Sequence, residues 1–372
     1  MGQMQLMDFN DYRMEKKYVD GVFKSKEELV EIAKSEGRTR VFKVLSFGGG
    51  TQSSHILELH LRKEKGYEYD AIVFSDLGAE PYFILNQVKF WQERQKQYGN
   101  TTPFIITHHS HMERGLEEML FRYMFTDYNR FQMPLYFKKI DYKGEVVPGG
   151  LMPRQCTAEF KIQPAQKAVR DYLKDTFGEE SNEKLENGVR VENQEETKKK
   201  RKLFPKTWAI IFDIGFSYTE LNRVNTYRSP QSSYIYLGYP LVEAGHSTED
   251  SINFLIENNL PTKRSRCYFC PFNCSGDRAK EIGMDWLEIV EDEPFSFLKA
   301  CYFDDKLREV QATGRKAMTS IPYFHFSRTP LKEVYAAQYE ILNARYKEDL
   351  IAWEKEWFSY LLNKYFKEDL AA

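Results

Sequence analysis

A glycine-rich segment is the first place in this chain where residue types and spacing indicate chemistry: Ser46-Phe47-Gly48-Gly49-Gly50-Thr51-Gln52-Ser53-Ser54. The apolar run 41–45 before it predicts a buried strand, and Ile56, Leu57, Leu59 and Leu61 after it have helical spacing. Glycines let backbone N–H groups approach a phosphate, while a helix N-terminus adds positive charge and serines add hydroxyl donors. We expect a phosphate-binding loop, although an ordinary glycine-rich turn remains an alternative. The segment matches neither the Walker A pattern nor GxGxxG.

Acidic residues follow the next predicted strand. The run 71–74 ends at Ser75-Asp76-Leu77-Gly78-Ala79-Glu80, and a carboxylate just past a strand end can bind a ribose hydroxyl or Mg²⁺. We expect a helix at 82–98, a third strand at 104–107, a helix at 164–177 and another strand at 208–212. Strands separated by helices predict an α/β fold with a doubly wound, mostly parallel sheet, whose ligands lie at the carboxyl ends of the strands.

Cysteine spacing indicates a metal site. Cys267, Cys270 and Cys274 lie close together in sequence, and Cys156 could complete a set of four sulfur ligands. Four thiolates suit either a structural zinc ion or an iron–sulfur cluster. The fifth cysteine, Cys301, lies on an apolar predicted helix and is expected in the core. His108-His109-Ser110-His111 lacks a matching carboxylate spacing, so we expect an exposed loop there.

Five motifs in order resemble a known family. The loop at 46–54 resembles the PP-loop of the adenine nucleotide α-hydrolase superfamily, in which Ser46, Gly48, Gly49 and Ser53 fit and Gln52 replaces the usual Asp. Asp76 to Glu80 and Arg154-Gln155-Cys156-Thr157 with Lys161 are similar to segments of phosphoadenosine phosphosulfate (PAPS) reductases. The stretch 213–223, where Thr219 replaces Asp, and the stretch 264–271 fit the PAPS reductase-like phage and prophage branch.

The resemblance implies an adenine nucleotide α-hydrolase-like fold and a PP-loop ATP pyrophosphatase that adenylates its substrate. Cysteine-bound iron–sulfur then suggests sulfur transfer onto a nucleic acid or nucleoside. It implies three cationic catalytic residues, Arg154, Lys161 and Arg223. The implied nucleotide-binding residues are Ser46, Gly48, Gly49, Gly50, Gln52, Ser53, Ser54, Asp76, Glu80, Gly215, Ser217 and Glu220. The implied cofactors are ATP or PAPS, Mg²⁺, and a [4Fe-4S] cluster or Zn²⁺ on Cys156, Cys267, Cys270 and Cys274.

Two other functions stay open. The first is a sulfonucleotide reductase, which needs a mobile redox cysteine near the C-terminus, and no cysteine follows Cys301. The second is a non-catalytic nucleotide-binding or interaction module, because Gln52 and Thr219 both replace Asp. The acceptor, the sulfur donor and a homodimer cannot be chosen from the residues.

Composition sets the outer limits. The chain has 372 residues, 42% of them hydrophobic, and a net charge of −2, which makes no global case for nucleic acid or a membrane surface. No apolar run has transmembrane length and no secretory signal is evident, so we expect a cytoplasmic protein. We predict an N-terminal extension (1–40), a nucleotide-binding domain (41–265) with a mobile insertion at 178–206, and a Cys-cluster and helical C-terminal region (266–372).

Overall fold

The computed structural model describes residues 14–18, 20–178, 204–276 and 284–366. The chain forms two compact units from alternating stretches: unit 1 is 1–74, 90–107 and 165–262, and unit 2 is 75–89, 108–164 and 263–372. The predicted boundaries near 40 and 265 remain a prediction. Most of the predicted insertion at 178–206, including its basic run Lys198–Lys202, lies outside the described residues.

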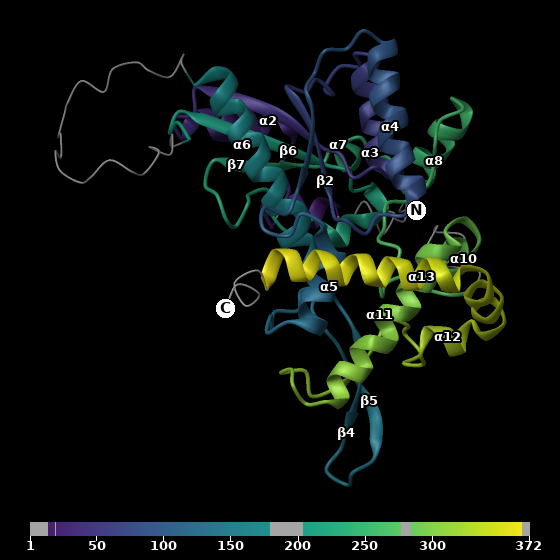
Figure 1. Cartoon of the computed structure of the whole chain (residues 1–372). Helices are drawn as coiled ribbons and strands as arrows, with labels where there is room; N and C mark the ends of the chain where they lie inside the picture. Colours follow the sequence, from purple (N-terminus) through teal and green to yellow (C-terminus); the bar gives the residue numbers. More distant parts are fainter. Residues whose placement is uncertain (1–13, 19, 179–203, 277–283, 367–372) are drawn as a thin grey trace, which may run out of the picture. The chain divides into compact units, whose positions relative to one another are not determined.

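A five-stranded parallel sheet organises unit 1, with the order β3-β2-β1-β6-β7. Figure 1 labels β2, β6 and β7 of this sheet. Its strands are β1 (Arg40–Ser46), β2 (Ala71–Asp76), β3 (Phe104–His108), β6 (Trp208–Ile214) and β7 (Ile235–Gly238). The central pair β1 and β6 is in register from Arg40 opposite Trp208 to Ser46 opposite Ile214. The predicted α/β class with a parallel sheet is therefore confirmed.

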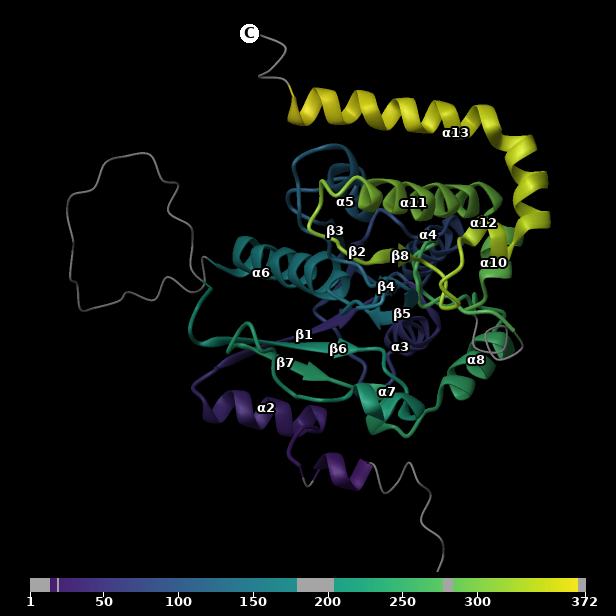
Figure 2. The same ribbon diagram turned by 90° about the horizontal axis from the view of Figure 1, so that it is seen from below.

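Helices cover both faces of this sheet. Alternate residues of a strand point to opposite faces, so Ile210 packs with Val169 and Leu173 of α6 (Gln163–Phe177). Ile211, the next residue of β6, packs with Leu29 and Ala33 of α2 (Lys26–Ser35) on the other face. Figure 2 shows α6 and α2 on opposite sides of β1, β6 and β7. This is the arrangement of a doubly wound fold.

Further helices connect the strands of this sheet or follow them in sequence. They are α3 (Thr51–Leu61), α4 (Tyr82–Gln97), α7 (Pro240–Glu243) and α8 (Thr248–Glu257), together with the 3-10 segment Tyr218–Arg223. The predicted helix at 82–98 is confirmed to within a residue. Ser247 and Asp250 form a capping box, in which Ser247 Oγ accepts from Asp250 N at 3.0 Å.

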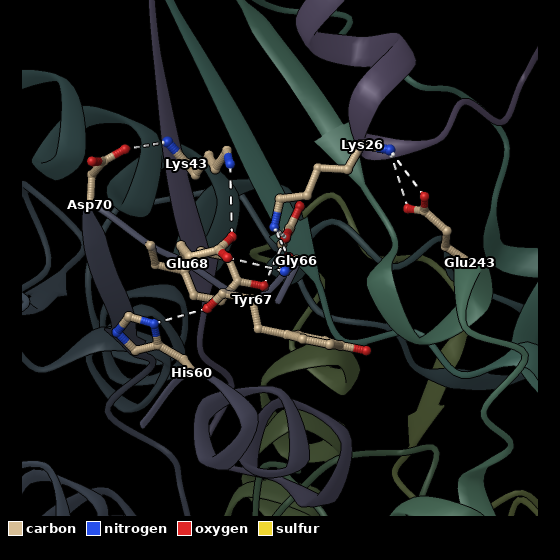
Figure 3. A network of polar contacts seen from close by, with 10 residues as sticks. Lys26, Lys43, His60, Gly66, Tyr67, Glu68, Asp70 and Glu243 are labelled. Carbon is tan, nitrogen blue, oxygen red and sulfur yellow. Dashed lines mark hydrogen bonds and ion pairs between the residues drawn. The ribbon is translucent and has the colours of Figure 1, made fainter. Parts of the chain in front are cut away.

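A buried ion pair fixes α2 to the sheet. Lys26 Nζ lies 2.6 Å from Asp213 Oδ2, which also accepts from Tyr69 OH at 2.7 Å. Lys26 Nζ further donates to the carbonyl of Gly66 at 2.7 Å (Figure 3). The backbone N–H of Lys26 donates to Glu243, which joins the start of α2 to α7. These partners compensate the cost of burying a lysine and an aspartate.

Unit 2 holds a second, antiparallel sheet that the sequence did not predict. Its strands are β4 (Tyr136–Ile140), β5 (Val146–Leu151) and β8 (Ile321–Tyr323), in the order β5-β4-β8. Its helices are α5 (Gly115–Phe125), α10 (Trp286–Asp292), α11 (Pro294–Ala312), α12 (Leu331–Val334) and α13 (Ala336–Tyr365). The helical pattern predicted from 329 to 366 is present as α12 and α13.

Aromatic side chains and two carboxylates hold α13 against α5. The rings of Phe121 and Trp357 stack with their centroids 4.6 Å apart. Trp357 Nε1 donates to Glu117 at 3.2 Å, and Tyr360 OH donates to Glu118 at 2.9 Å. The C-terminal helix is therefore a packed part of unit 2, and Cys301 lies in the same core, as predicted.

In the part of the chain that the structure describes, no helix is both long enough and apolar enough to cross a membrane.

Candidate functional site

The glycine-rich segment forms a tight loop between β1 and α3. Gly49 has φ +71°, a backbone conformation open to glycine at little cost, and Gly50 is the N-cap of α3 without a capping side chain. Ser53 closes the loop from inside, because its Oγ accepts from Gly48 N at 3.1 Å and donates to Gly50 O at 3.0 Å. The loop thus presents the start of a helix at the carboxyl end of a central strand, which is where an anion is stabilised.

Ser54 adds a polar atom behind the loop. Its side chain is fully buried, and its Oγ has no hydrogen-bond partner among the described residues. Thr51, by contrast, is fixed, because its Oγ1 donates to the carbonyl of Thr262 at 2.8 Å.

The loop after β6 packs directly on the start of α3. A Cβ atom at Gly215 would lie 3.0 Å from Ser53 N and 3.3 Å from Ser53 Cα, tighter than ordinary contacts. Glycine at 215 therefore allows the close approach of two backbone segments. This contact brings together the segments 46–54 and 213–223, which both resemble family motifs.

A polar network joins those two segments. Gln52 Nε2 donates to Glu220 Oε2 at 3.2 Å and lies 3.4 Å from Thr248 Oγ1. Ser217 Oγ bonds with Glu220 at 3.3 Å and Thr248 at 2.8 Å, and Thr219 Oγ1 lies 3.1 Å from Ser217 Oγ. The family that the sequence resembles has Asp at the positions of Gln52 and Thr219. Here the Gln52 amide bonds with the carboxylate of Glu220, and the Thr219 hydroxyl bonds with Ser217.

Arg223 is positioned by the same carboxylate. Its Nη1 lies 2.8 Å from Glu220 Oε1, and its guanidinium lies 3.9 Å from the ring centroid of Phe216. The side chain is exposed on its outer side, so a charged group remains available to an anion at this end of unit 1.

His55 anchors the helix that carries the loop. Its side chain is buried, its Nδ1 lies 3.1 Å from Ser251 Oγ of α8, and its ring stacks on Phe254 with centroids 4.1 Å apart. Burial, followed by the nearby charge of His246, lowers the pKa of His55 to about 4. The imidazole is therefore neutral at physiological pH.

The other predicted site residues belong to unit 2. Asp76 Oδ1 accepts from Gly78 N at 2.7 Å, and Glu80 Oε2 accepts from Leu77 N at 2.9 Å, so both carboxylates shape the turn after β2. Glu80 is buried and its Oε1 has no hydrogen-bond partner among the described residues. Burial raises the pKa of Glu80 to about 8; the charge of Lys161 opposes this shift and that of Asp76 adds to it.

Three predicted cysteine ligands lie around Arg154. Burial works to lower the pKa of this guanidinium, but the charges of Cys270, Cys156 and Cys267 outweigh it, so the pKa is raised. Burial raises the pKa of the Cys267 thiol well above its usual range, and the charge of Cys270 adds to the shift. Arg154 also lies 5.6 Å from the ring centroid of Phe272, which belongs to the cysteine turn.

Cys274 is placed differently from the other three. Its backbone is fixed by bonds from Cys274 N to Met284 O at 2.7 Å and from Trp286 N to Cys274 O at 3.0 Å. Its Sγ lies 3.3 Å from the carbonyl of Phe272. Within the described residues, no group of three or more His, Cys, Asp or Glu side chains is arranged to hold a metal ion. The chemistry of the donors suits a metal, but their present arrangement is not a coordination shell.

A cavity of about 290 Å³ in unit 1 lies apart from the loop. It is lined by Lys26, Glu27, Val30, Glu31, Lys43, Lys65, Gly66 and Glu68, several of which are drawn in Figure 3, and by none of the predicted site residues. Its lysines and glutamates balance in charge, so we assign it no ligand.

No family model, curated protein or solved structure matches this chain. The site is therefore argued from its own geometry. Unit 1 brings together the loop 46–54, Gly215, Ser217, Glu220 and Arg223, whereas unit 2 brings together Asp76 with Glu80 and Arg154 with the cysteines. Thr248 and Thr262 could not be predicted as part of the site, because a threonine at a helix start or in a loop carries no signal for a partner distant in the chain.

We expect Gln52→Asp to destabilise the protein by roughly 2 kcal/mol near pH 8, because it replaces an amide donor with a carboxylate facing that of Glu220. Urea denaturation would measure the loss. The double variant Gln52→Asp/Glu220→Gln restores one amide and one carboxylate and should recover most of it. Equal stability of Gln52→Asp and the parent would contradict the described network.

We also expect a specific loss of stability in acid. When the pKa of a histidine falls from 6.5 to about 4 on folding, the unfolded chain takes up the proton at a higher pH than the folded chain does. This contribution to the free energy of unfolding is therefore fully present above pH 6.5 and is lost as the pH falls toward 4. Between pH 7 and pH 5 the parent should lose about 2 kcal/mol more than His55→Gln, which keeps a polar partner for Ser251. Chemical denaturation at the two pH values measures the difference, and parallel losses in both proteins would refute the assignment to His55.

Proposed function

We propose that the chain binds ATP at the loop of unit 1 and activates an acceptor by adenylation, as a PP-loop ATP pyrophosphatase does. The observation that carries this proposal is the cradle of Gly48 to Ser54, where an uncapped helix start follows a glycine with φ +71° at the end of a central parallel strand. Such a cradle offers backbone donors to a polyphosphate without reorganisation.

In the proposed reaction an acceptor oxygen attacks the α-phosphorus of ATP. A new oxygen–phosphorus bond forms, the bond to the bridging oxygen breaks, and pyrophosphate leaves with that electron pair. The loop and Ser54 would hold the phosphates, and Arg223, held by Glu220, would neutralise charge that develops on them. Asp76 and Glu80 are proposed for ribose or Mg²⁺, and Arg154 and Lys161 for the anionic end of the substrate.

We further propose that Cys156, Cys267, Cys270 and Cys274 hold a metal group, a [4Fe-4S] cluster or alternatively Zn²⁺. Support comes from the shared surroundings of Cys156, Cys267 and Cys270 around Arg154. Burial raises the thiol pKa values of Cys267 and Cys270, and a bound cation would reverse that shift. When bound, an iron–sulfur group would supply the sulfur-transfer chemistry expected for a nucleic-acid or nucleoside acceptor.

A non-catalytic nucleotide-binding module is the second candidate. One observation favours it: Gln52 and Thr219 occupy two positions where the resembling family has Asp. Gln52 bonds with Glu220 and Thr248, and Thr219 bonds with Ser217 and Thr248. A sulfonucleotide reductase has less support, because Cys301 is buried in the core of unit 2 and burial raises the pKa of its thiol well above the usual range.

We expect the parent to bind ATP with Mg²⁺ in calorimetric titration, and to bind PAPS more weakly. Gly49→Ala should reduce ATP affinity at least about tenfold, because alanine opposes the positive φ and removes the close backbone approach. Gly144→Ala is the matched control, since that glycine also has positive φ but lies in open space in unit 2. Preference for PAPS would favour the reductase, and no binding of either nucleotide would overturn the proposal. Release of pyrophosphate from bound ATP would support the enzyme over the module, which binds ATP without cleaving it.

We expect anaerobically purified protein to contain metal by elemental analysis, with visible absorption if the group is an iron–sulfur cluster. Cys267→Ala or Cys270→Ala should lose the metal and lower the melting temperature, because metal binding contributes folding free energy. Cys301→Ala, a buried thiol outside the set, is the control and should keep the metal. Unchanged metal content in Cys267→Ala, or its absence from the parent, would refute the site.

A further inference from the structure

The antiparallel sheet of unit 2 carries a concentration of positive charge that the whole-chain charge conceals. Residues 128–156 contain Arg130, Lys138, Lys139, Lys143 and Arg154 against Asp141 and Glu145, and residues 313–330 contain Arg315, Lys316 and Arg328 with no acidic residue. These eight basic and two acidic residues have a formal charge of +6, in a chain whose net charge is −2. We call this sheet and its two flanking segments the basic sheet surface.

Tertiary contacts bring the two segments together. β4 pairs with β8, so that Lys138 lies opposite Ile321. Arg328 donates from Nε to the carbonyl of Phe137 at 2.9 Å and from Nη2 to that of Gly149 at 3.0 Å, which joins it to both strands of the hairpin. Lys316 Nζ similarly donates to the carbonyl of Tyr128 at 3.0 Å. Carbonyl partners hold both cations in place, and the carboxylate of Asp127 lies near Lys316.

The hairpin of β4 and β5 exposes its cations. Lys139 and Lys143 are exposed, and neither forms an ion pair with any part of the chain that the structure describes. Asp141, the nearest acidic residue in sequence, is occupied by the turn, because its Oδ1 accepts from the backbone N–H groups of Lys143 and Glu145. Figure 1 shows the hairpin extending away from α5 and α11 of the same unit.

Exposed aromatic and apolar side chains accompany the charge. Tyr142 at the end of the hairpin is 92% exposed, and Phe326 in the loop after β8 is 44% exposed. Ile140 and Val146 face each other across the hairpin and are both exposed. A flat aromatic ring beside lysines is the combination that stacks on an unpaired base while the cations contact the phosphates.

We propose that the basic sheet surface binds single-stranded nucleic acid, with the strand's phosphates on Lys138, Lys139 and Lys143 and a base stacked on Tyr142. A second copy of the chain would place one surface of charge +6 against another, so charge favours a polyanion over self-association. A duplex keeps its bases stacked and therefore offers no partner to Tyr142. This inference deepens the proposed function, and rests on it only in naming the strand as the acceptor.

Fluorescence anisotropy of the full chain with a labelled oligonucleotide of about 20 nucleotides tests the proposal. DNA and RNA strands of one sequence, and the corresponding duplex, are compared without nucleotide at about 50 and 200 mM salt. We expect single strands to bind more tightly than the duplex, and binding to weaken with salt. Lys139→Glu/Lys143→Glu should weaken binding at least about tenfold and reduce the salt dependence, and Tyr142→Ala should weaken it at least about fivefold.

Lys347→Glu/Lys355→Glu is the matched control, because both lysines are exposed on α13 and the change in charge is the same. It should bind within about twofold of the parent. Absence of binding by the parent, an equal loss in this control, or loss only when Lys198–Lys202 are replaced would overturn the proposal. Lys139, Tyr142, Lys143, Lys347 and Lys355 are exposed, and melting temperatures check that each variant is folded.

The outcome for this surface is separable from that for the nucleotide loop. Gly49→Ala should bind the strand as the parent does while losing ATP. Strand binding without ATP binding would support the proposed strand-binding surface and overturn the proposed pyrophosphatase. ATP binding without strand binding would overturn the strand-binding surface and leave the proposed ATP site supported. The acceptor would then be sought among small molecules.

Discussion

The candidate nucleotide site depends on one close contact. The loop between β6 and the 3-10 segment Tyr218–Arg223 approaches the first turn of α3. A Cβ at Gly215 would lie 3.0 Å from Ser53 N, so any larger residue at that position would crowd the two backbones where they meet. The contact places Ser217 and Glu220 beside Gln52 and so assembles the polar network around one carboxylate. Parallel pairing of β1 with β6 over seven residues supplies the framework that holds the two loops at the same sheet edge.

Unit 1 pairs its most deeply buried carboxylates with cations. The carboxylates that lie deepest, Asp213 and Glu58, are each paired with cations and with a tyrosine hydroxyl, as burial demands. The start of α3, in contrast, has no capping side chain, and Ser54 Oγ has no hydrogen-bond partner among the described residues. The first N–H groups of a helix have no partner within the helix, so a helix start without a capping side chain suits the oxygens of a polyphosphate.

Unit 2 combines a rigid core with two chemically distinct features. Stacked aromatic rings and the carboxylates of Glu117 and Glu118 fix α13 to α5 and make a stable support. On that support lie the cysteines around Arg154 and the basic sheet surface, which share the segment 128–156. Cations and thiols on neighbouring stretches of unit 2 would contact the acceptor in the proposed function, and the loop of unit 1 would bind ATP.

The sequence by itself determined the parallel α/β class, the strand boundaries around the glycine-rich loop, the helix at 82–98 and the capping box of α8, because these depend on local periodicity, glycine and capping chemistry. Tertiary structure alone decided which segments meet. Neither the bond from Thr51 to Thr262 nor the pairing of β4 with β8 could be predicted, since the partners are separated by far more chain than any local pattern spans. The basic sheet surface was invisible for the same reason, because its charges come from two distant segments that cancel against acidic residues elsewhere in the chain.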